Sequence, residues 1–377
     1  MSGLRISADR LLGDLARLAA IGGRPDGGVD RVAGSDADRE ARRWLAGRMR
    51  EAGLEPRTDP VGSVFGRLPE SPGPWLLVGS HTDTVPAGGR LDGAYGVVAA
   101  LEVARALIES RHAAAPVVEV VSFWDEEGAG PGGGVVGSRA LCQSPHVREL
   151  RGYLEIHIEQ GPRMVAEGVE LAVVEGIVGI SRFDVILEGE PNHAGTTPFP
   201  LRKDAGRAAA RVVAGLREML SEIDPEMVGN AGVISFAPGA PNVVPGRAEI
   251  VVEMRSIRPG ALERGAGSLR ARVADIAREE GCAFQVRHRS GSGRPQFMDA
   301  GVIAALERAC ARVGRPWRRL VSGAGHDAGM LALEVPAGML FVPSTGGISH
   351  SPREHTEDRL LVQGAEALLE GTLEILH

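Results

Sequence analysis

The chain has 377 residues, of which 43% are hydrophobic and 24% are charged. This composition is ordinary for a folded globular protein and excludes a disordered chain, and the length favours two domains over one. The formal net charge is only −7 and long runs of one sign are absent, which argues against nucleic acid or an anionic membrane as a partner.

Helices and strands alternate through the first part of the chain. The predicted elements are helices at 7–21 and 36–53, a strand at 75–80, a helix at 97–107, and strands at 117–124 and 153–158. The helices have apolar residues on one side, and the strands are short apolar runs. This alternation indicates an α/β domain with a mostly parallel, doubly wound sheet.

The pattern changes near residue 179, where we predict a second domain. Its elements are a strand at 181–188, a helix at 203–221, strands at 231–237 and 245–256, a helix at 261–280 and a strand at 283–289. This β-α-β-β-α-β order is that of a ferredoxin-like α+β domain. The first pattern then resumes with a helix at 299–313, a strand at 339–342 and a helix at 358–376. We therefore predict a discontinuous catalytic domain, residues 1–178 and 291–377, with residues 179–290 inserted into it.

Histidines and carboxylates follow the predicted strands of the first domain. His81 follows one strand, Glu126 and Glu127 follow another, His157 lies late in a third, and His350 comes several residues after a fourth. Ligands bind outside the carboxyl ends of the strands in open α/β sheets, so we expect these side chains to converge. Any one of these segments alone is as readily a solvated surface or an ordinary strand-end histidine. The complete set indicates a metal centre.

The residue types suit a pair of divalent cations, which imidazole nitrogens and carboxylate oxygens bind. Asp92 lies in the glycine-flanked segment RLDGAYG and suits a position between two cations. Asp83, two residues after His81, is expected to accept the second ring N–H of that histidine and fix its tautomer. One carboxylate of the Glu126–Glu127 pair would bind a cation and the other would act as general base on the attacking water. The spacing leaves open which does which.

The cysteines and the N-terminal segment bear on the compartment. Cys142, Cys282 and Cys310 are odd in number and widely spaced, so we expect free thiols rather than disulfides or a cysteine zinc site. The N-terminal segment lacks a signal-peptide core, and the chain has no apolar run long enough to span a membrane. We therefore expect a cytoplasmic protein.

Several segments resemble one known family almost from end to end. They are GGVDRVAGSDAD, GSHTDTVPAGGRLDGAYGV, DEEG, LEIHIEQGP, NHAGTTP, PNVVPG, SGAGHDA and FVPSTGGISHSPREHT. The chain resembles the hydantoinase/carbamoylase branch of the M20 metallopeptidase-like family, which includes N-carbamoyl-L-amino-acid hydrolases, β-ureidopropionases and allantoate amidohydrolases. LEIHIEQGP and GGISHSP are the segments most specific to this branch.

The resemblance implies a role for each residue of the expected metal centre. His81 and His157 would bind one cation, Glu127 and His350 would bind the other, Asp92 would bridge them, and Glu126 would be the base. Zinc is the first expectation for both cations, with manganese, cobalt or nickel as alternatives. The resemblance also implies a homodimer formed through the inserted domain.

The resemblance also implies a substrate site, made of Gln160, His193, Asn242, Arg255 and His326. The Arg255 guanidinium can bind a carboxylate through two hydrogen bonds, so a small free-acid substrate is implied. His193 is expected to stabilise the oxyanion on domain closure. His326 could contact the substrate or hold its own loop. Without the resemblance, Arg255 would be a strand salt bridge, Asn242 a turn residue and His193 a solvated loop residue.

The expected reaction is hydrolysis of a linear amide or ureido C–N bond next to a carboxylate. An N-carbamoyl-L-amino acid would give the amino acid, ammonia and carbon dioxide. Alternative substrates are allantoate or another ureide, and an N-acyl amino acid or dipeptide. A non-catalytic binding protein is disfavoured because Glu126 and every expected ligand are present.

The segment between DEEG and LEIHIEQG departs from the family pattern. Similar proteins have an Arg-Phe pair after DEEG and a segment about twice as long before LEIHIEQG. Here the pair is absent and the segment reads AGPGGGVVGSRALCQSPHVRELRGY. Because strand ends position the metal ligands, we expect the shortening to change the wall of the substrate pocket and not the metal centre.

Overall fold

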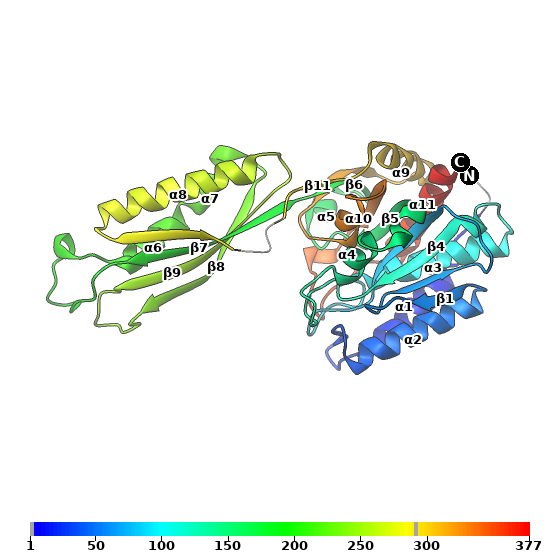
Figure 1. Ribbon diagram of the computed structural model, residues 1–377, viewed down its shortest axis with the longest axis horizontal. Helices are drawn as coiled ribbons and strands as arrows, with labels where there is room; N and C mark the ends of the chain where they lie inside the picture. The colour runs from blue at the N-terminus through cyan, green and yellow to red at the C-terminus, as the bar shows by residue number, and fades with distance from the viewer. Residues whose placement is uncertain (1–3, 290–292) are drawn as a thin grey trace. The chain divides into compact units, whose positions relative to one another are not determined.

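A computed structural model describes residues 4–289 and 293–377 (Figure 1). The described residues form two compact units. Unit 1 comprises Met1–Gly176 and Phe297–His377, and unit 2 comprises Ile177–Gln296. Unit 2 is thus inserted into the sequence of unit 1. Among the described residues, no helix has both the length and the apolar character needed to cross a membrane.

Unit 1 contains a mixed sheet with a parallel centre. Its order is β1-β2-β4-β3-β5-β13-β6-β11, with β12 beside β6. The neighbours β4, β3, β5 and β13 run parallel, whereas β1, β2 and β6 pair antiparallel. The strands are β1 (Glu55–Thr58), β2 (Val64–Arg67), β3 (Trp75–His81), β4 (Val118–Phe123), β5 (Leu150–Ile158), β6 (Leu171–Ile177), β11 (Gln296–Phe297), β12 (Trp317–Ser322) and β13 (Ala337–Val342).

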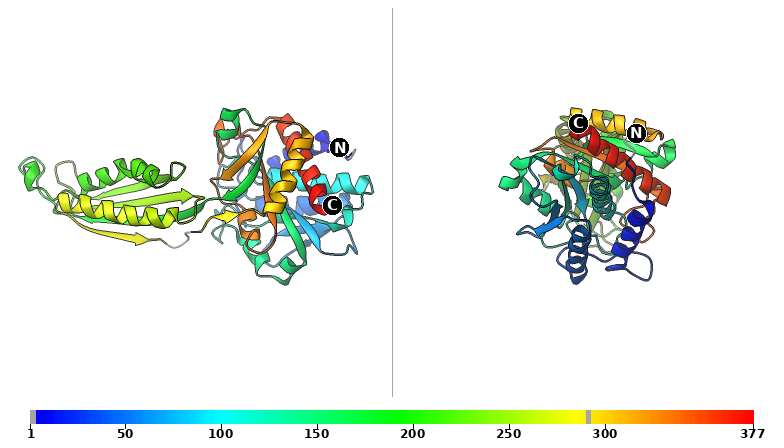
Figure 2. Two further views of the ribbon diagram at one scale, coloured as in Figure 1. Left: turned by 90° about the horizontal axis from the view of Figure 1, so that it is seen from above. Right: turned by 90° about the vertical axis from the view of Figure 1, so that its right-hand side faces the viewer.

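Helices cover both faces of this sheet (Figures 1 and 2). They are α1 (Ala8–Ala20), α2 (Asp36–Glu51), α3 (Ala94–Glu109), α4 (Val136–Cys142), α5 (Arg163–Glu167), α9 (Ala300–Val313), α10 (Asp327–Leu331) and α11 (Asp358–Leu376). Gly96 of α3 packs against Ser80, and Gly137 of α4 packs against Phe123. Ser80 pairs with Ser122, so these two side chains lie on the same face of the sheet. Phe123 follows Ser122 and points to the other face, so α3 and α4 lie on opposite faces. Strands buried on both faces are mostly apolar, and every residue of β3, β4 and β13 is buried.

Unit 2 contains a separate antiparallel sheet with the order β10-β7-β9-β8. Helices lie over one face of the sheet (Figure 1). Alternate residues of β7, such as Phe183, Val185 and Leu187, are buried in the core beneath these helices. The elements are β7 (Gly179–Glu188), α6 (Ala205–Ala214), α7 (Leu216–Ile223), β8 (Val228–Ala237), β9 (Arg247–Ser256), α8 (Ala261–Glu279) and β10 (Ala283–His288). The prediction of one helix at 203–221 is wrong because α6 ends at Ala214 and α7 begins at Leu216, with Gly215 between them. Glycine is a weak helix former, which favours a break there.

Candidate metal centre

The parallel strands of unit 1 deliver the predicted residues to one edge of the sheet. His81 is the last residue of β3, and His157 lies next to the last residue of β5. Glu126 and Glu127 follow the end of β4, and His350 follows β13. The side chains therefore come together from separate parts of the chain, as the strand-end pattern predicts.

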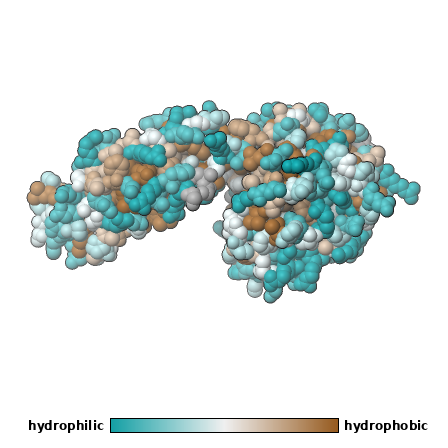
Figure 3. Space-filling view, viewed as in Figure 1, coloured by the Kyte–Doolittle hydropathy of each residue, from teal (hydrophilic) through white to brown (hydrophobic). Residues whose placement is uncertain are grey.

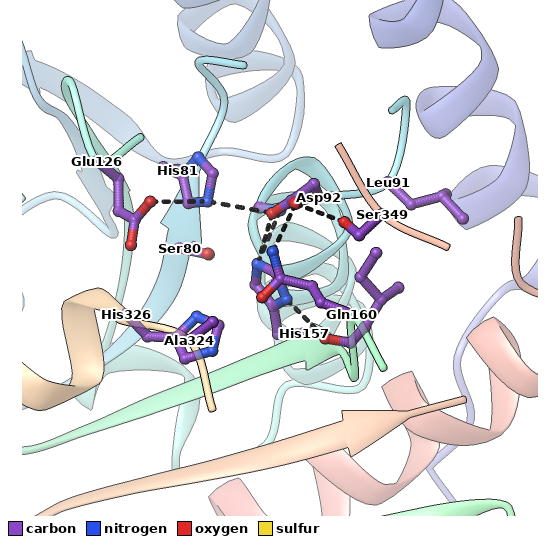
Figure 4. A network of polar contacts seen from close by, with 12 residues as sticks. Ser80, His81, Leu91, Asp92, Glu126, His157, Gln160, Ala324, His326 and Ser349 are labelled. Atoms are coloured by element: carbon purple, nitrogen blue, oxygen red, sulfur yellow. Dashed lines mark hydrogen bonds and ion pairs between the residues drawn. The ribbon is translucent and has the colours of Figure 1, made fainter. Parts of the chain in front are cut away.

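Asp92, in the loop before α3, lies beside His81, His157 and Gln160 (Figure 4). Its Oδ1 is 3.0 Å from His157 Nε2 and 3.7 Å from His81 Nε2. Its Oδ2 is 3.2 Å from His350 Nε2, which is also 3.2 Å from Glu127 Oε2. Among the described residues, candidate ligand atoms within 4.8 Å of one another form three groups, which are His81–Asp92–His157, Asp92–Glu127–His350 and Glu155–His157–His326. The Asp92 carboxylate belongs to the first two groups and faces each with a different oxygen.

The two buried histidines direct their Nε2 atoms at Asp92. His81 Nδ1 is 3.0 Å from the backbone oxygen of Asp83, and His157 Nδ1 is 2.8 Å from that of Ile158. A carbonyl oxygen only accepts hydrogen bonds, so each Nδ1 carries a proton and Nε2 is the nitrogen left to bind a cation. Gly93 N–H also donates to His157 Nε2. Nε2 atoms directed at a carboxylate suit a cation between them, because the cation takes the place of a proton on each imidazole.

Asp83 makes contacts that its spacing from His81 does not predict. Its Oδ1 is 3.5 Å from His81 Nδ1, farther than its own backbone oxygen. The two carboxylate oxygens instead accept the backbone N–H groups of Glu126 at 3.3 Å and Glu127 at 3.2 Å. Asp83 therefore ties the segment after β3 to the segment that carries both glutamates.

Burial and neighbouring charges shift the ionisation of these groups. Burial raises the pKa of Glu126 well above its ordinary value, although the charge of His81 opposes this. The Glu126 side chain is only 9% exposed and its Oε2 lies 3.6 Å from His81 Nε2. Hydrogen bonds to Asp92 and Glu127 raise the pKa of His350 to about 10. Without a cation His350 thus holds a proton at neutral pH, which an incoming cation must displace.

Two buried oxygens at this site lack a hydrogen-bond partner within the described chain. They are Glu127 Oε1 and Gln160 Oε1. Gln160 Nε2 donates to Asp92 Oδ2 at 2.7 Å and lies 3.4 Å from His350 Nε2. Buried oxygens are normally satisfied, so unpaired oxygens beside imidazoles and carboxylates fit a site for divalent cations.

His326 contacts its own loop. Its side chain is buried, its Nε2 lies 2.9 Å from Ser322 Oγ, and its ring centroid is 4.7 Å from that of His157. Burial lowers the pKa of His326 well below its ordinary value, and the charge of His157 adds to this. The sequence leaves open whether His326 contacts the substrate or holds its own loop. These contacts are of the kind expected if His326 holds its loop.

The remaining predicted substrate residues belong to unit 2. His193 Nδ1 accepts the N–H groups of Gly195 and Thr196, so its Nε2 carries the proton and is a hydrogen-bond donor. The neighbouring Ala194 N–H donates to the backbone oxygen of Asn242, which brings these two loops together. Arg255 lies in β9, and its Nε donates to Glu253 Oε1 at 2.7 Å.

Two residues that contact Asp92, namely Ser349 and Glu354, are not predicted from the sequence. Ser349 Oγ is 2.9 Å from Asp92 Oδ2, and Glu354 Oε1 accepts the N–H groups of Leu91 and Asp92. Both residues lie in the segment GGISHSPREHT, in which His350 is the predicted ligand. The signal available in the sequence was a carboxylate, Glu354, four residues after that ligand.

Two ligand groups that share one carboxylate, at the carboxyl edge of an α/β sheet, define a candidate dinuclear metal centre of the hydrolytic class. The family model for peptidase family M20/M25/M40 matches residues 77–373. The chain belongs to this family.

Relatives and solved structures match nearly the whole chain. It is 35% identical to the allantoate amidohydrolase of Bacillus subtilis, over 93% of each chain. It is 32% identical to an N-carbamoyl-L-amino-acid amidohydrolase of a Pseudomonas species, over 99% of each chain. The crystal structure of a hydantoinase/carbamoylase family amidase from Burkholderia multivorans superposes with a TM-score of 0.92 at 31% identity, covering 99% of this chain and 98% of that chain.

Proposed function

We propose that the protein is a metal-dependent amidohydrolase that converts an N-carbamoyl-L-amino acid to the amino acid, ammonia and carbon dioxide. The observation that carries the proposal is the position of Asp92, whose two oxygens face two different groups of ligands. A ureide such as allantoate is the second candidate substrate, because the relative of that name is 35% identical. The cysteines are free thiols, which supports the cytoplasm as the location.

The residues at the centre would hold two divalent cations, most simply zinc, with manganese, cobalt or nickel as alternatives. His81 and His157 would hold one and Glu127 and His350 the other, with Asp92 between them. Bound cations at this position would polarise the scissile carbonyl and lower the pKa of water.

Further side chains would do the proton transfers and bind the substrate. Glu126 would take a proton from the attacking water and give it to the leaving nitrogen, which a largely buried carboxylate with a raised pKa suits. His193 would donate its Nε2 proton to the oxyanion. Arg255 would bind the substrate carboxylate.

The two groups of proposed substrate residues in unit 2 lie at opposite ends of its sheet. His193 and Val243 form a bridge near the end of β7 where Glu188 pairs with Arg247, whereas Arg255 pairs with Ile180 at the other end. The continuous strand from Arg247 to Arg255 spans about 27 Å at about 3.4 Å per residue. A small amino-acid derivative cannot contact both ends. We therefore propose that His193 and Asn242 serve the site of a second copy of the chain.

An edge strand of unit 2 supports assembly through this unit. β8 is at the edge of the sheet, and nearly all of its residues are exposed. Val228 is 54% exposed, Val233 56% and Phe236 47%, and hydrophobic atoms are visible at the surface of unit 2 (Figure 3). An exposed apolar edge strand is a common site of pairing with another chain. We propose that the protein is a homodimer formed along this edge.

Complementation between two inactive variants should test this arrangement. Glu126→Gln and His193→Ala homodimers should each be nearly inactive, since one lacks the base and the other the oxyanion donor. If His193 acts across the dimer, each mixed dimer has one complete site. Random exchange should then restore up to about one quarter of the wild-type activity. A mixture as inactive as its parents, with exchange verified by mass, would show that His193 acts within its own chain.

Replacing Arg255 with alanine should raise KM for an N-carbamoyl amino acid by roughly 10- to 100-fold, because a charged hydrogen bond is worth about 1.5–3 kcal/mol. Metal content should be unchanged. Arg182→Ala is the matched control, because Arg182 binds the other oxygen of Glu253 at 2.6 Å. Steady-state kinetics of both variants would decide. Equal KM values in wild type and Arg255→Ala would remove the reason to expect a free-acid substrate.

A panel of substrates tests the proposed reaction. The metal-loaded protein would be offered N-carbamoyl and N-acetyl amino acids, dipeptides and ureides, with ammonia and free amine measured separately. Turnover of N-carbamoyl amino acids with release of both products is expected. Ammonia release from ureides alone would establish the second candidate, and amine release without ammonia from acetyl or dipeptide substrates would overturn both.

A further inference from the structure

One buried carboxylate ties together the two loops that carry Asp92 and His350. Glu354 lies between β13 and α11 and is only 4% exposed. Its Oε1 accepts the backbone N–H groups of Leu91 at 2.8 Å and Asp92 at 3.1 Å. These contacts fix the main chain of the loop from which the Asp92 side chain projects.

The other oxygen of Glu354 reaches the Asp92 side chain through a serine. Ser349 Oγ lies 2.8 Å from Glu354 Oε2 and 2.9 Å from Asp92 Oδ2. Ser349 directly precedes His350, whose Nε2 is 3.2 Å from the same Asp92 oxygen. Glu354 therefore restrains Asp92 at both its backbone and its side chain, and restrains the His350 segment as well.

The space around Glu354 is shaped to hold its carboxylate in one place. A Cβ atom built on Gly89 would lie 2.0 Å from Glu354 Oε1 and Cδ. Only a residue without a side chain leaves room for the carboxylate here, because real Cβ atoms do not approach other atoms so closely. The loop before Asp92 and the carboxylate thus fit one another.

We infer that Glu354 is a positioning residue for the metal centre, which holds the Asp92 carboxylate between the two groups of ligands. This inference rests on the proposed function, since it assumes that cations bind at Asp92. Glu354 touches no reacting atom and acts through Leu91, Asp92 and Ser349. Residues that orient metal ligands in this way typically contribute about 10- to 100-fold to metal affinity.

The test is a measurement of Zn²⁺ affinity by competition with a chromophoric chelator. Glu354→Ala should bind Zn²⁺ about 10- to 100-fold more weakly than wild type. Glu354→Gln should remain close to wild type, because its amide oxygen still accepts both N–H groups and its amide nitrogen can donate to Ser349. Glu119→Ala is the matched control. Glu119 is a buried acid of β4 bound to Arg57, Arg67 and His146, so its loss should lower stability and leave Zn²⁺ affinity unchanged.

Gly89→Ala provides a second variant that leaves Glu354 intact. Its methyl group should displace the carboxylate and weaken Zn²⁺ binding, and this effect should largely vanish in the Glu354→Ala background because the space is then open. The inference would be overturned if Glu354→Ala bound Zn²⁺ with wild-type affinity, or if Glu119→Ala weakened the binding equally. It would also be overturned if the effects of Gly89→Ala and Glu354→Ala on Zn²⁺ affinity were additive. If wild type itself binds no Zn²⁺, the proposed function fails instead.

Discussion

Replacing Glu126 with glutamine should lower kcat by about 10²- to 10⁴-fold, the usual contribution of a general base. An amide has nearly the same shape as the carboxylate but cannot accept the proton of water. The backbone N–H of Glu126 should keep its contact with Asp83, so the loop should stay in place. Steady-state kinetics and metal analysis of the same preparation would measure both consequences.

The neighbouring glutamate supplies the contrast for this prediction. Glu127→Gln should weaken metal binding, because Glu127 Oε2 lies beside His350 and its other oxygen has no hydrogen-bond partner among the described residues. Glu149→Gln, at an acid that is 57% exposed, should change neither property. A Glu126→Gln variant with the native rate would show that another group is the base.

Replacing Asp92 with alanine should abolish activity and weaken the binding of both cations by more than about 100-fold. Among the described residues, Asp92 belongs both to the group with His81 and His157 and to the group with Glu127 and His350, so its loss removes an oxygen from each. The effect should exceed the roughly 10- to 100-fold typical of residues that only orient ligands. Metal titration of the purified variant would give the stoichiometry and the affinity.

Asp14→Asn is a matched control for Asp92→Ala. Asp14 is a fully buried aspartate of α1 that binds Arg105 at 2.7 Å and Arg48 at 3.1 Å. Its replacement should lower the melting temperature without changing metal stoichiometry. Retention of either cation at wild-type affinity in Asp92→Ala would contradict the bridging role.

The sequence predicts the elements whose pattern is complete within a short window. Mostly apolar runs identify β3, β4, β5 and β13, because parallel strands buried on both faces are nearly continuous in apolar residues. β1 and β2 are not predicted, since each has four residues and β1 is polar and largely exposed. The turn at Gly215 is also missed, because the apolar periodicity continues across it from α6 into α7.

The candidate site also has a part that the sequence predicts and a part that only the structure shows. The metal ligands can be predicted because strand ends bring them to one edge without further information. The contacts of Glu354 with Leu91 and Asp92 join residues more than 260 positions apart, through backbone N–H groups that every residue has. The separation of His193 from Arg255 is likewise visible only from the pairing of β7 with β9.

Anomalous diffraction from crystals of the zinc-loaded protein would test the two-metal centre most directly. We expect two zinc peaks about 3.5–4 Å apart. One should lie beside His81 and His157, the other beside Glu127 and His350, and both should contact Asp92. A single peak, or a pair of peaks that Asp92 does not join, would contradict this account.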